Sequence, residues 1–199
     1  MNLPNKITLS RIFMIPVFVL VFFLDGVLPF NYGIAAIIFA VAACTDFIDG
    51  HIARSRGLVT NLGKFLDPIA DKVLVSTAMI LILTMGNSLF VHVGEAAQAI
   101  YVVTAICICI IIAREFIISA FRQIAATNNF VLAAEKLGKY KTACQDVSIF
   151  VLIFAASFQN TFGTILAYVG FVLFAVATIL TIWSGISYVV KYKNVLKDA

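Results

Sequence analysis

The sequence is poor in charged residues and in cysteine. Of its 199 residues, 14 are Lys or Arg, 10 are Asp or Glu and 4 are Cys. So few charges exclude a water-soluble globular protein and a disordered chain, and so few cysteines exclude a disulfide scaffold. The chain also has no internal repeat and no low-complexity segment. Hydrophobic residues fill it instead: they make up 62%, or about 123 positions.

The hydrophobic residues are gathered in long runs. A transmembrane helix needs about 20 mostly apolar residues, and the length of these runs favours helices over buried strands. The expected spans are residues 12–30, 33–53, 65–85, 98–120, 143–159 and 163–189. The predicted fold is therefore all-α: a single polytopic membrane domain over residues 1–199 with six transmembrane helices.

The first apolar run follows two basic residues, as in a signal peptide, but no small-residue cleavage site follows it, so we expect a retained span. Residues 2–11 are expected to form a short N-terminal interfacial helix, with Pro4 in its first turn. Small residues in the last run suit close helix packing or the face of a homodimer. They are Gly170, Ala175, Ala177, Ser184 and Gly185.

All 14 basic residues fall on one side of the predicted spans, and the opposite links carry only Asp25 and Glu95. The bases are Lys6, Arg11, Arg54, Arg56, Lys64, Lys72, Arg114, Arg122, Lys136, Lys139, Lys141, Lys191, Lys193 and Lys197. By the positive-inside rule, this side and both termini are expected in the cytoplasm. The expected location is a bacterial-type cell membrane.

Four of the ten acids lie within 26 residues, at Asp46, Asp49, Asp67 and Asp71. Asp46 and Asp49 are three residues apart and Asp67 and Asp71 are four apart, so each pair shares one helix face. Folding the two spans into a hairpin brings both pairs together near the basic side. Close carboxylates repel one another unless they take up protons or bind cations. A set of oxygen ligands without His or Cys suits Mg²⁺, Mn²⁺ or Ca²⁺.

Small residues stand beside the acids, one turn from Asp46 at Gly50 and one turn before Asp67 at Gly63. Together with Ala53 they leave room for a ligand, and two metals in such a site can clamp a phosphoryl group. Two other interpretations remain open. The acids could pair with nearby bases for packing, as in a structural or scaffold protein, or they could line the path of a divalent-cation transporter.

The full pattern is D-x-x-D-G-x-x-A-R over Asp46–Arg54, eight residues, then G-x-x-x-D-x-x-x-D over Gly63–Asp71. It resembles the signature of the CDP-alcohol phosphotransferase family, a family of membrane enzymes with six spans. The resemblance implies that an alcohol displaces CMP from a CDP-linked donor. It also implies two divalent ions, Mg²⁺ or Mn²⁺, held by Asp46, Asp49, Asp67 and Asp71.

The same resemblance implies roles for single residues. Asp71 would be the general base. The nucleotide and its phosphates would be lined by Asn5, Thr8, Asp49, Gly50, Ala53, Arg54, Gly63 and Lys72. No nucleic acid is expected as a partner.

A second basic cluster is expected to bind the acceptor, because Arg and Lys suit a phosphate group. Its residues are Arg114, Arg122, Lys136, Lys139 and Lys141. Their local sequence, and the opening Asn5-x-x-Thr8-x-x-Arg11, are similar to the phosphatidylglycerophosphate synthase branch of the family; Ser119-Ala120-Phe121 stands where that branch has Ser-Gly-Leu. The similarity implies CDP-diacylglycerol as donor and sn-glycerol 3-phosphate as acceptor. An inositol-phosphate or a phosphatidylglycerol acceptor remains an alternative within the family.

Overall fold

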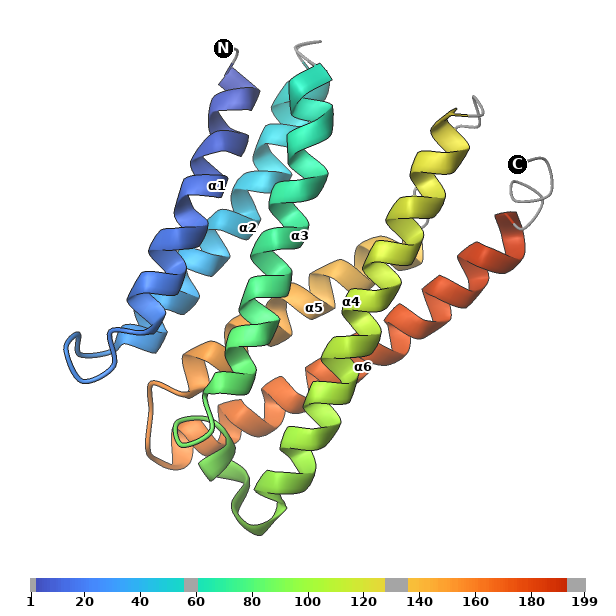
Figure 1. The fold of residues 1–199 in the computed structure, drawn as a ribbon. Coiled ribbons are helices and arrows are strands. Elements are labelled where there is room, and N and C mark those ends of the chain that lie inside the picture. Colours follow the sequence, from blue (N-terminus) through green and yellow to red (C-terminus); the bar gives the residue numbers. More distant parts are fainter. Residues whose placement is uncertain (1–2, 56–60, 128–135, 193–199) are drawn as a thin grey trace.

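The computed structural model describes the backbone of residues 3–55, 61–127 and 136–192, and the side chains of residues 8–45, 66, 68–123 and 137–192. Within that part of the chain, six α-helices run alternately up and down (Figure 1). They are α1 Leu3–Phe22, α2 Asn31–Ser55, α3 Asn61–Thr84, α4 Ala97–Thr127, α5 Lys136–Ala155 and α6 Thr161–Tyr192, and a 3-10 helix, η1 Phe90–Ala96, precedes α4. The expected all-α fold is confirmed.

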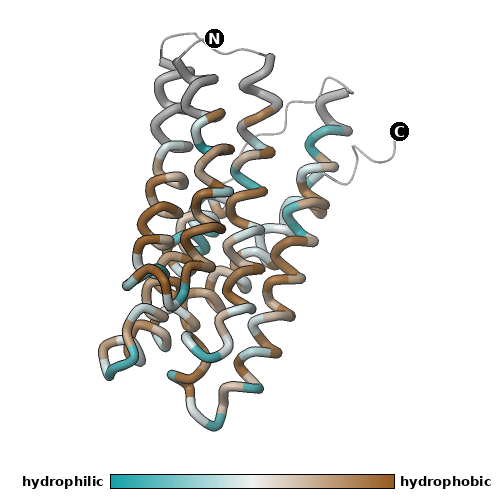
Figure 2. Tube along the Cα trace, turned by 60° about the vertical axis from the view of Figure 1, so that its left-hand side comes forward, coloured by the Kyte–Doolittle hydropathy of each residue, from teal (hydrophilic) through white to brown (hydrophobic). Residues whose placement is uncertain are grey.

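Two segments are long and apolar enough to cross a membrane, Phe90–Gln123 and Thr161–Tyr192. Shorter apolar stretches cover Thr8–Phe22 and Asn31–Thr45. Figure 2 shows the hydrophobic residues concentrated along the helices and many hydrophilic ones in the connecting loops. The number of spans, six, stays a prediction.

The expected separate interfacial helix at residues 2–11 is wrong for the described residues. From Leu3 onward this segment forms one continuous helix with the first span, and Pro4 lies in its first turn. Thr8 and Arg11 are almost completely buried. The face of the helix that carries Thr8 and Arg11 therefore packs against the bundle, while Ser10 is exposed.

Polar side chains fix two of the helix ends. Asn31 donates from Nδ2 to the carbonyl oxygen of Phe22 at 2.9 Å, satisfying a group that the end of α1 leaves open. The first helix therefore ends at Phe22 rather than near residue 30. Asn160 precedes α6, and its Oδ1 accepts a hydrogen bond from the backbone N–H of Gly163 at 3.1 Å, as an N-cap does.

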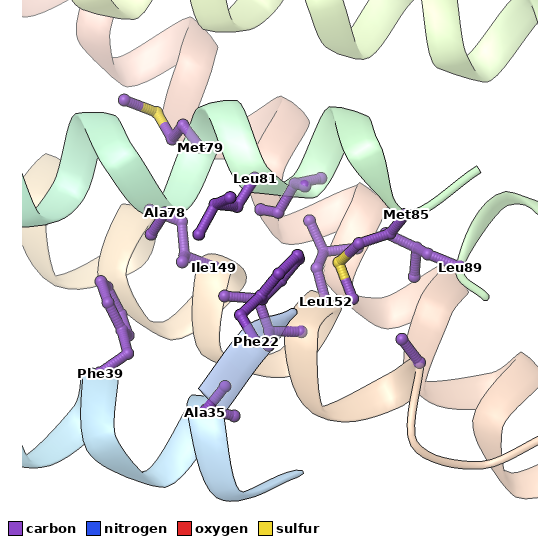
Figure 3. Packing of buried hydrophobic residues seen from close by; sticks show 14 of the residues in the cluster. Phe22, Ala35, Phe39, Ala78, Met79, Leu81, Met85, Leu89, Ile149 and Leu152 are labelled. Atoms are coloured by element: carbon purple, nitrogen blue, oxygen red, sulfur yellow. The ribbon is translucent and has the colours of Figure 1, made fainter. Parts of the chain in front are cut away.

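The core lies where α1, α2, α3 and α5 meet (Figure 3). Phe22, Phe39, Met79 and Ile149, one from each of these helices, are almost fully buried. The helix α6 packs along α5, and Gly170 permits this close approach because a Cβ there would lie 2.7 Å from Leu152 Cδ2.

Candidate active site

The acid motif spans two helices that contact each other. Asp46 and Asp49 belong to the last part of α2, and Asp67 and Asp71 belong to α3, which runs beside it (Figure 1). Asp71 is half-buried. The side chains of the other three acids lie outside the described residues, as do those of Gly50, Ala53, Arg54 and Gly63. The predicted pairing of these two spans is thus present in the backbone, while the carboxylate positions stay a prediction.

Lys72 connects the acid helix to α4. Its ammonium group donates a hydrogen bond to the hydroxyl of Ser119, and that hydroxyl donates to the backbone oxygen of Glu115 at 2.8 Å. Glu115 and Asp71 also act on Lys72 as nearby negative charges. Lys72 was expected on the donor side only, but the structure places it next to residues of the acceptor-side pattern.

Glu115 joins two of the predicted acceptor-binding cations. A single carboxylate oxygen, Oε1, accepts a hydrogen bond from Arg114 Nη1 at 3.0 Å and another from Lys141 Nζ at 2.5 Å. Lys141 is only 3% exposed although it carries an ammonium group. A charge removed from water requires a paired and hydrogen-bonded partner, and Glu115 is that partner.

The helix α6 completes this group. Arg114 Nη2 donates to the hydroxyl oxygen of Ser184 at 2.9 Å. Gly185, the next residue, lies against the side chain of Arg114: a Cβ at this position would come within 3.1 Å of Arg114 Cγ. Arg114 is thus held from two sides, by Glu115 of its own helix and by Ser184 of α6.

The structure does not gather every residue of the predicted basic cluster. Arg122 is exposed and lies over the ring of Tyr188, with Cζ 5.6 Å from the ring centre. Lys139 is exposed on the first turns of α5. Lys136 begins α5, and its side chain lies outside the described residues. Within the described part, the convergent cations are therefore Lys72, Arg114 and Lys141. They surround the carboxylate of Glu115 and the hydroxyls of Ser119 and Ser184.

At the start of the chain, the structure describes Thr8 but not the side chain of Asn5. Thr8 is 1% exposed and Arg11 is fully buried on α1, which packs against α2 and α3. Arg11, whose buried guanidinium lies on a helix beside the two acid-bearing helices, was not among the expected site residues. The sequence pointed to Arg11 only through its place in the Asn5-x-x-Thr8-x-x-Arg11 pattern.

Residues 1–183 match the family model described as CDP-alcohol phosphatidyltransferase. The chain belongs to the CDP-alcohol phosphatidyltransferase family. Two similar proteins, from Shigella flexneri and Escherichia coli, are each 39% identical over 189 residues, covering 94% of this chain and 92% of theirs. A third, from Bacillus subtilis, is 39% identical over 162 residues, which is 76% of each chain. All three are named CDP-diacylglycerol–glycerol-3-phosphate 3-phosphatidyltransferase.

Family membership and the apolar helices together make this a membrane-embedded transferase. The transporter and scaffold interpretations of the acids are therefore set aside.

Enzymes of the CDP-alcohol phosphatidyltransferase family generally depend on divalent metals. Among the described side chains, no three His, Cys, Asp or Glu residues gather closely enough to hold a metal ion, but three of the four motif acids lie outside that set. The ligand atoms of the motif fit a divalent metal site. All of them are carboxylate oxygens on two helices in contact, and Mg²⁺ and Mn²⁺ prefer this ligand type.

Four residues of the observed network were not predicted as part of the site: Glu115, Ser119, Ser184 and Gly185. The sequence offered a signal for the first two, because Glu115 and Ser119 lie in the acceptor-side pattern. Ser184 and Gly185 were interpreted as a packing or dimer surface. Their contact with Arg114 joins residues 70 positions apart, and no local pattern encodes such a contact.

Proposed function

We propose that this protein transfers the phosphatidyl group of CDP-diacylglycerol to sn-glycerol 3-phosphate, giving phosphatidylglycerophosphate and CMP. The observation that carries the proposal is the convergence of Lys72, Arg114 and Lys141 beside Asp71. Three cations near two carboxylates, those of Glu115 and Asp71, leave positive charge available for an anionic acceptor. A neutral alcohol would not use this charge, whereas the phosphate of glycerol 3-phosphate would.

In this proposal, the acceptor phosphate binds Arg114 and Lys141, and the exposed Arg122 and Lys139, with Lys136, approach it from the water side. The bidentate donor edge of arginine suits a phosphate group. Lys72 lies between this phosphate and the donor, because it contacts Ser119 on one side and follows Asp71 on the other. The cations thus orient the acceptor's free hydroxyl toward α3.

The donor nucleotide and its phosphates occupy the region of the acid motif. The residues proposed to line them are Asn5, Thr8, Asp49, Gly50, Ala53, Arg54 and Gly63. Asp46, Asp49, Asp67 and Asp71 would hold two divalent ions, Mg²⁺ or Mn²⁺, which when bound neutralise the pyrophosphate. A phosphatidylglycerol or inositol-phosphate acceptor is the alternative within the family.

Asp71 acts as the general base in this mechanism. The acceptor hydroxyl is a weak nucleophile and needs a carboxylate within hydrogen-bond reach. Its oxygen attacks the phosphorus that bears the diacylglycerol, while its proton passes to a carboxylate oxygen of Asp71. The bond from that phosphorus to the CMP oxygen breaks, and CMP leaves with the electron pair.

We also propose that six spans cross the membrane and that both termini and the site face the cytoplasm, since all 14 bases lie on one side of the predicted spans. The homodimer stays a prediction. Its motivating residues Gly170, Ala177, Ser184 and Gly185 are buried against the chain's own helices, while Ala175 is exposed.

Release of CMP from CDP-diacylglycerol by the purified protein tests the proposal. We expect release only when glycerol 3-phosphate and Mg²⁺ or Mn²⁺ are both present, and loss of it when a chelator removes the metal. Inositol phosphate, phosphatidylglycerol and serine serve as competing acceptors in the same assay. Faster release with inositol phosphate would move the protein to another branch of the family, and no release with any acceptor would contradict the activity.

A further inference from the structure

Arg114 is the residue of the proposed acceptor site whose orientation depends on a second helix. It lies near the middle of α4, where its side chain is mostly buried at 16% exposure. A guanidinium has five N–H donors in one plane, and its usefulness to a phosphate depends on which edge it presents. The contacts of Arg114 therefore decide what the site can bind.

Two hydrogen bonds fix that plane. Nη1 donates to Glu115 Oε1 at 3.0 Å and Nη2 donates to Ser184 Oγ at 2.9 Å. The third nitrogen, Nε, is buried and has no hydrogen-bond partner in the described part of the chain. Glu115 is the residue next to Arg114 on the same helix, so it cannot by itself fix the guanidinium relative to α6. That contact comes from Ser184.

The hydroxyl of Ser184 is oriented to accept. It is 2% exposed, and its own hydrogen is directed to the backbone oxygen of Thr181 at 3.1 Å. Its oxygen lone pair is thereby free to face Arg114. The acceptor role of Ser184 does not change with pH, because a serine hydroxyl stays neutral.

Gly185 supplies the space for the aliphatic part of Arg114. A Cβ on this residue would lie 3.1 Å from Arg114 Cγ and 3.5 Å from Arg114 Nε. The first of these distances is tighter than ordinary contact, so a side chain would push the arginine away from α6. Ser184 and Gly185 thus act together, one by a hydrogen bond and the other by the absence of a side chain.

We propose that Ser184 and Gly185 of α6 are positioning residues that set the acceptor affinity of the enzyme by holding the guanidinium of Arg114 in place. The inference rests on the proposed function, in which Arg114 binds the acceptor phosphate. It assigns α6, which carries no residue of the acid motif or of the basic cluster, a part in acceptor recognition. The expected ligand is a phosphomonoester on a small polar alcohol.

The test compares Ser184→Ala with Ser148→Ala. Ser148 is a matched control because it is fully buried and its hydroxyl donates only to a backbone oxygen of its own helix, that of Gln145. We expect Ser184→Ala to raise the KM for glycerol 3-phosphate about tenfold or more, the effect of losing one hydrogen bond to a charged group. The KM for CDP-diacylglycerol should stay within twofold, and Ser148→Ala should change neither constant.

A second pair of variants tests the space at Gly185. Gly185→Ala is expected to raise the acceptor KM in the same way. Gly170→Ala, on the same helix, crowds Leu152 instead of Arg114. Gly170→Ala should reduce stability without raising the KM for glycerol 3-phosphate relative to the KM for CDP-diacylglycerol. This variant therefore distinguishes a general disturbance of α6 from displacement of Arg114.

A double-mutant cycle ties the effect to Arg114. In an Arg114→Lys background the Nη2 donor is gone, so adding Ser184→Ala should change acceptor binding less than twofold. Equilibrium binding of radiolabelled glycerol 3-phosphate gives this readout even where turnover is too slow to measure. An unchanged acceptor KM in Ser184→Ala, with a raised one in Arg114→Lys, would overturn the positioning role alone. Unchanged acceptor binding in Arg114→Lys would overturn the acceptor site on which it rests.

Discussion

Asp71 and Lys72 are neighbours in the sequence with opposite charges, and both are half-buried. Consecutive residues of a helix do not share a face. Since Lys72 is directed to Ser119 of α4, the carboxylate of Asp71 projects from a different face, the one that it shares with Asp67 four residues earlier. On this turn of α3, the side chain of Lys72 therefore extends toward α4, and the side chain of Asp71 leaves the helix on the face of the acid motif.

Replacing Asp71 with Asn tests its role as the base. The amide keeps the size of the side chain but cannot take the proton of the acceptor hydroxyl, so turnover should fall by about 10²-fold to 10⁴-fold. Binding of the CDP-linked donor should stay measurable by equilibrium titration. Asp25→Asn is the control, because Asp25 is exposed in the α1–α2 link; near-normal turnover in Asp71→Asn would remove this residue from the chemistry.

Sequence spacing predicts that each acid pair shares one helix face, because i to i+3 and i to i+4 relations on a helix need no tertiary information; the joint site of the four acids stays a prediction. It also placed Arg114 and Lys141 in one cluster, which the structure confirms. It could not predict that Glu115 joins them through one oxygen. Nor could it place Ser184, because that contact depends on how α4 and α6 pack against each other.

At the scale of helices, apolar runs predicted six elements and the structure has six in its described part. The ends of the helices were less predictable, because side chains outside each apolar run determine where the helix stops. Asn31 terminates α1 by binding the oxygen of Phe22, nine residues earlier. The N-terminal segment was misassigned for a related reason: burial of Thr8 and Arg11 depends on the helices around them.

Gly170 gives a prediction about helix packing. In Gly170→Ala, the new Cβ would lie 2.7 Å from Leu152 Cδ2 and 3.3 Å from its backbone nitrogen, so α5 and α6 must separate. Overpacking of this kind costs about 1–3 kcal/mol. We expect a lower midpoint of thermal unfolding in detergent, measured against Gly86→Ala, where a Cβ meets nothing within 4 Å. Equal midpoints in the two variants would contradict the close packing.

For the whole molecule, the alternation of the helices places the start of α1, the end of α2, the start of α3 and the ends of α4 and α6 toward one end (Figure 1). Among the described bases, Arg11, Lys72, Arg122 and Lys191 lie on the parts of these helices nearer this end. The opposite end holds the α1–α2 link, the α3–η1 link and the α5–α6 link. The two ends therefore differ in charge, which is the property that determines orientation in a membrane.

Labelling of single cysteines tests this orientation. The four native cysteines, none of them in a disulfide, would first be replaced by Ser or Ala. Asn87→Cys and Lys139→Cys then place exposed thiols at opposite ends. In intact cells, a membrane-impermeant maleimide should label only the first, and permeabilisation should expose the second. The reverse pattern would place the site outside the cytoplasm.

The length of α4 has a consequence for how substrates and products travel. Arg114 is 17 residues beyond Ala97, about 26 Å along the helix at 1.5 Å per residue, and a bilayer's hydrocarbon is about 30 Å thick. In the proposed orientation, with Ala97 at one edge of the hydrocarbon layer, the guanidinium would lie near the other edge. The proposed water-soluble acceptor would then reach it from the aqueous phase, while the lipid donor would arrive sideways within its leaflet. After the proposed transfer, the nucleotide would leave into water and the new phospholipid would diffuse away in the plane of the membrane.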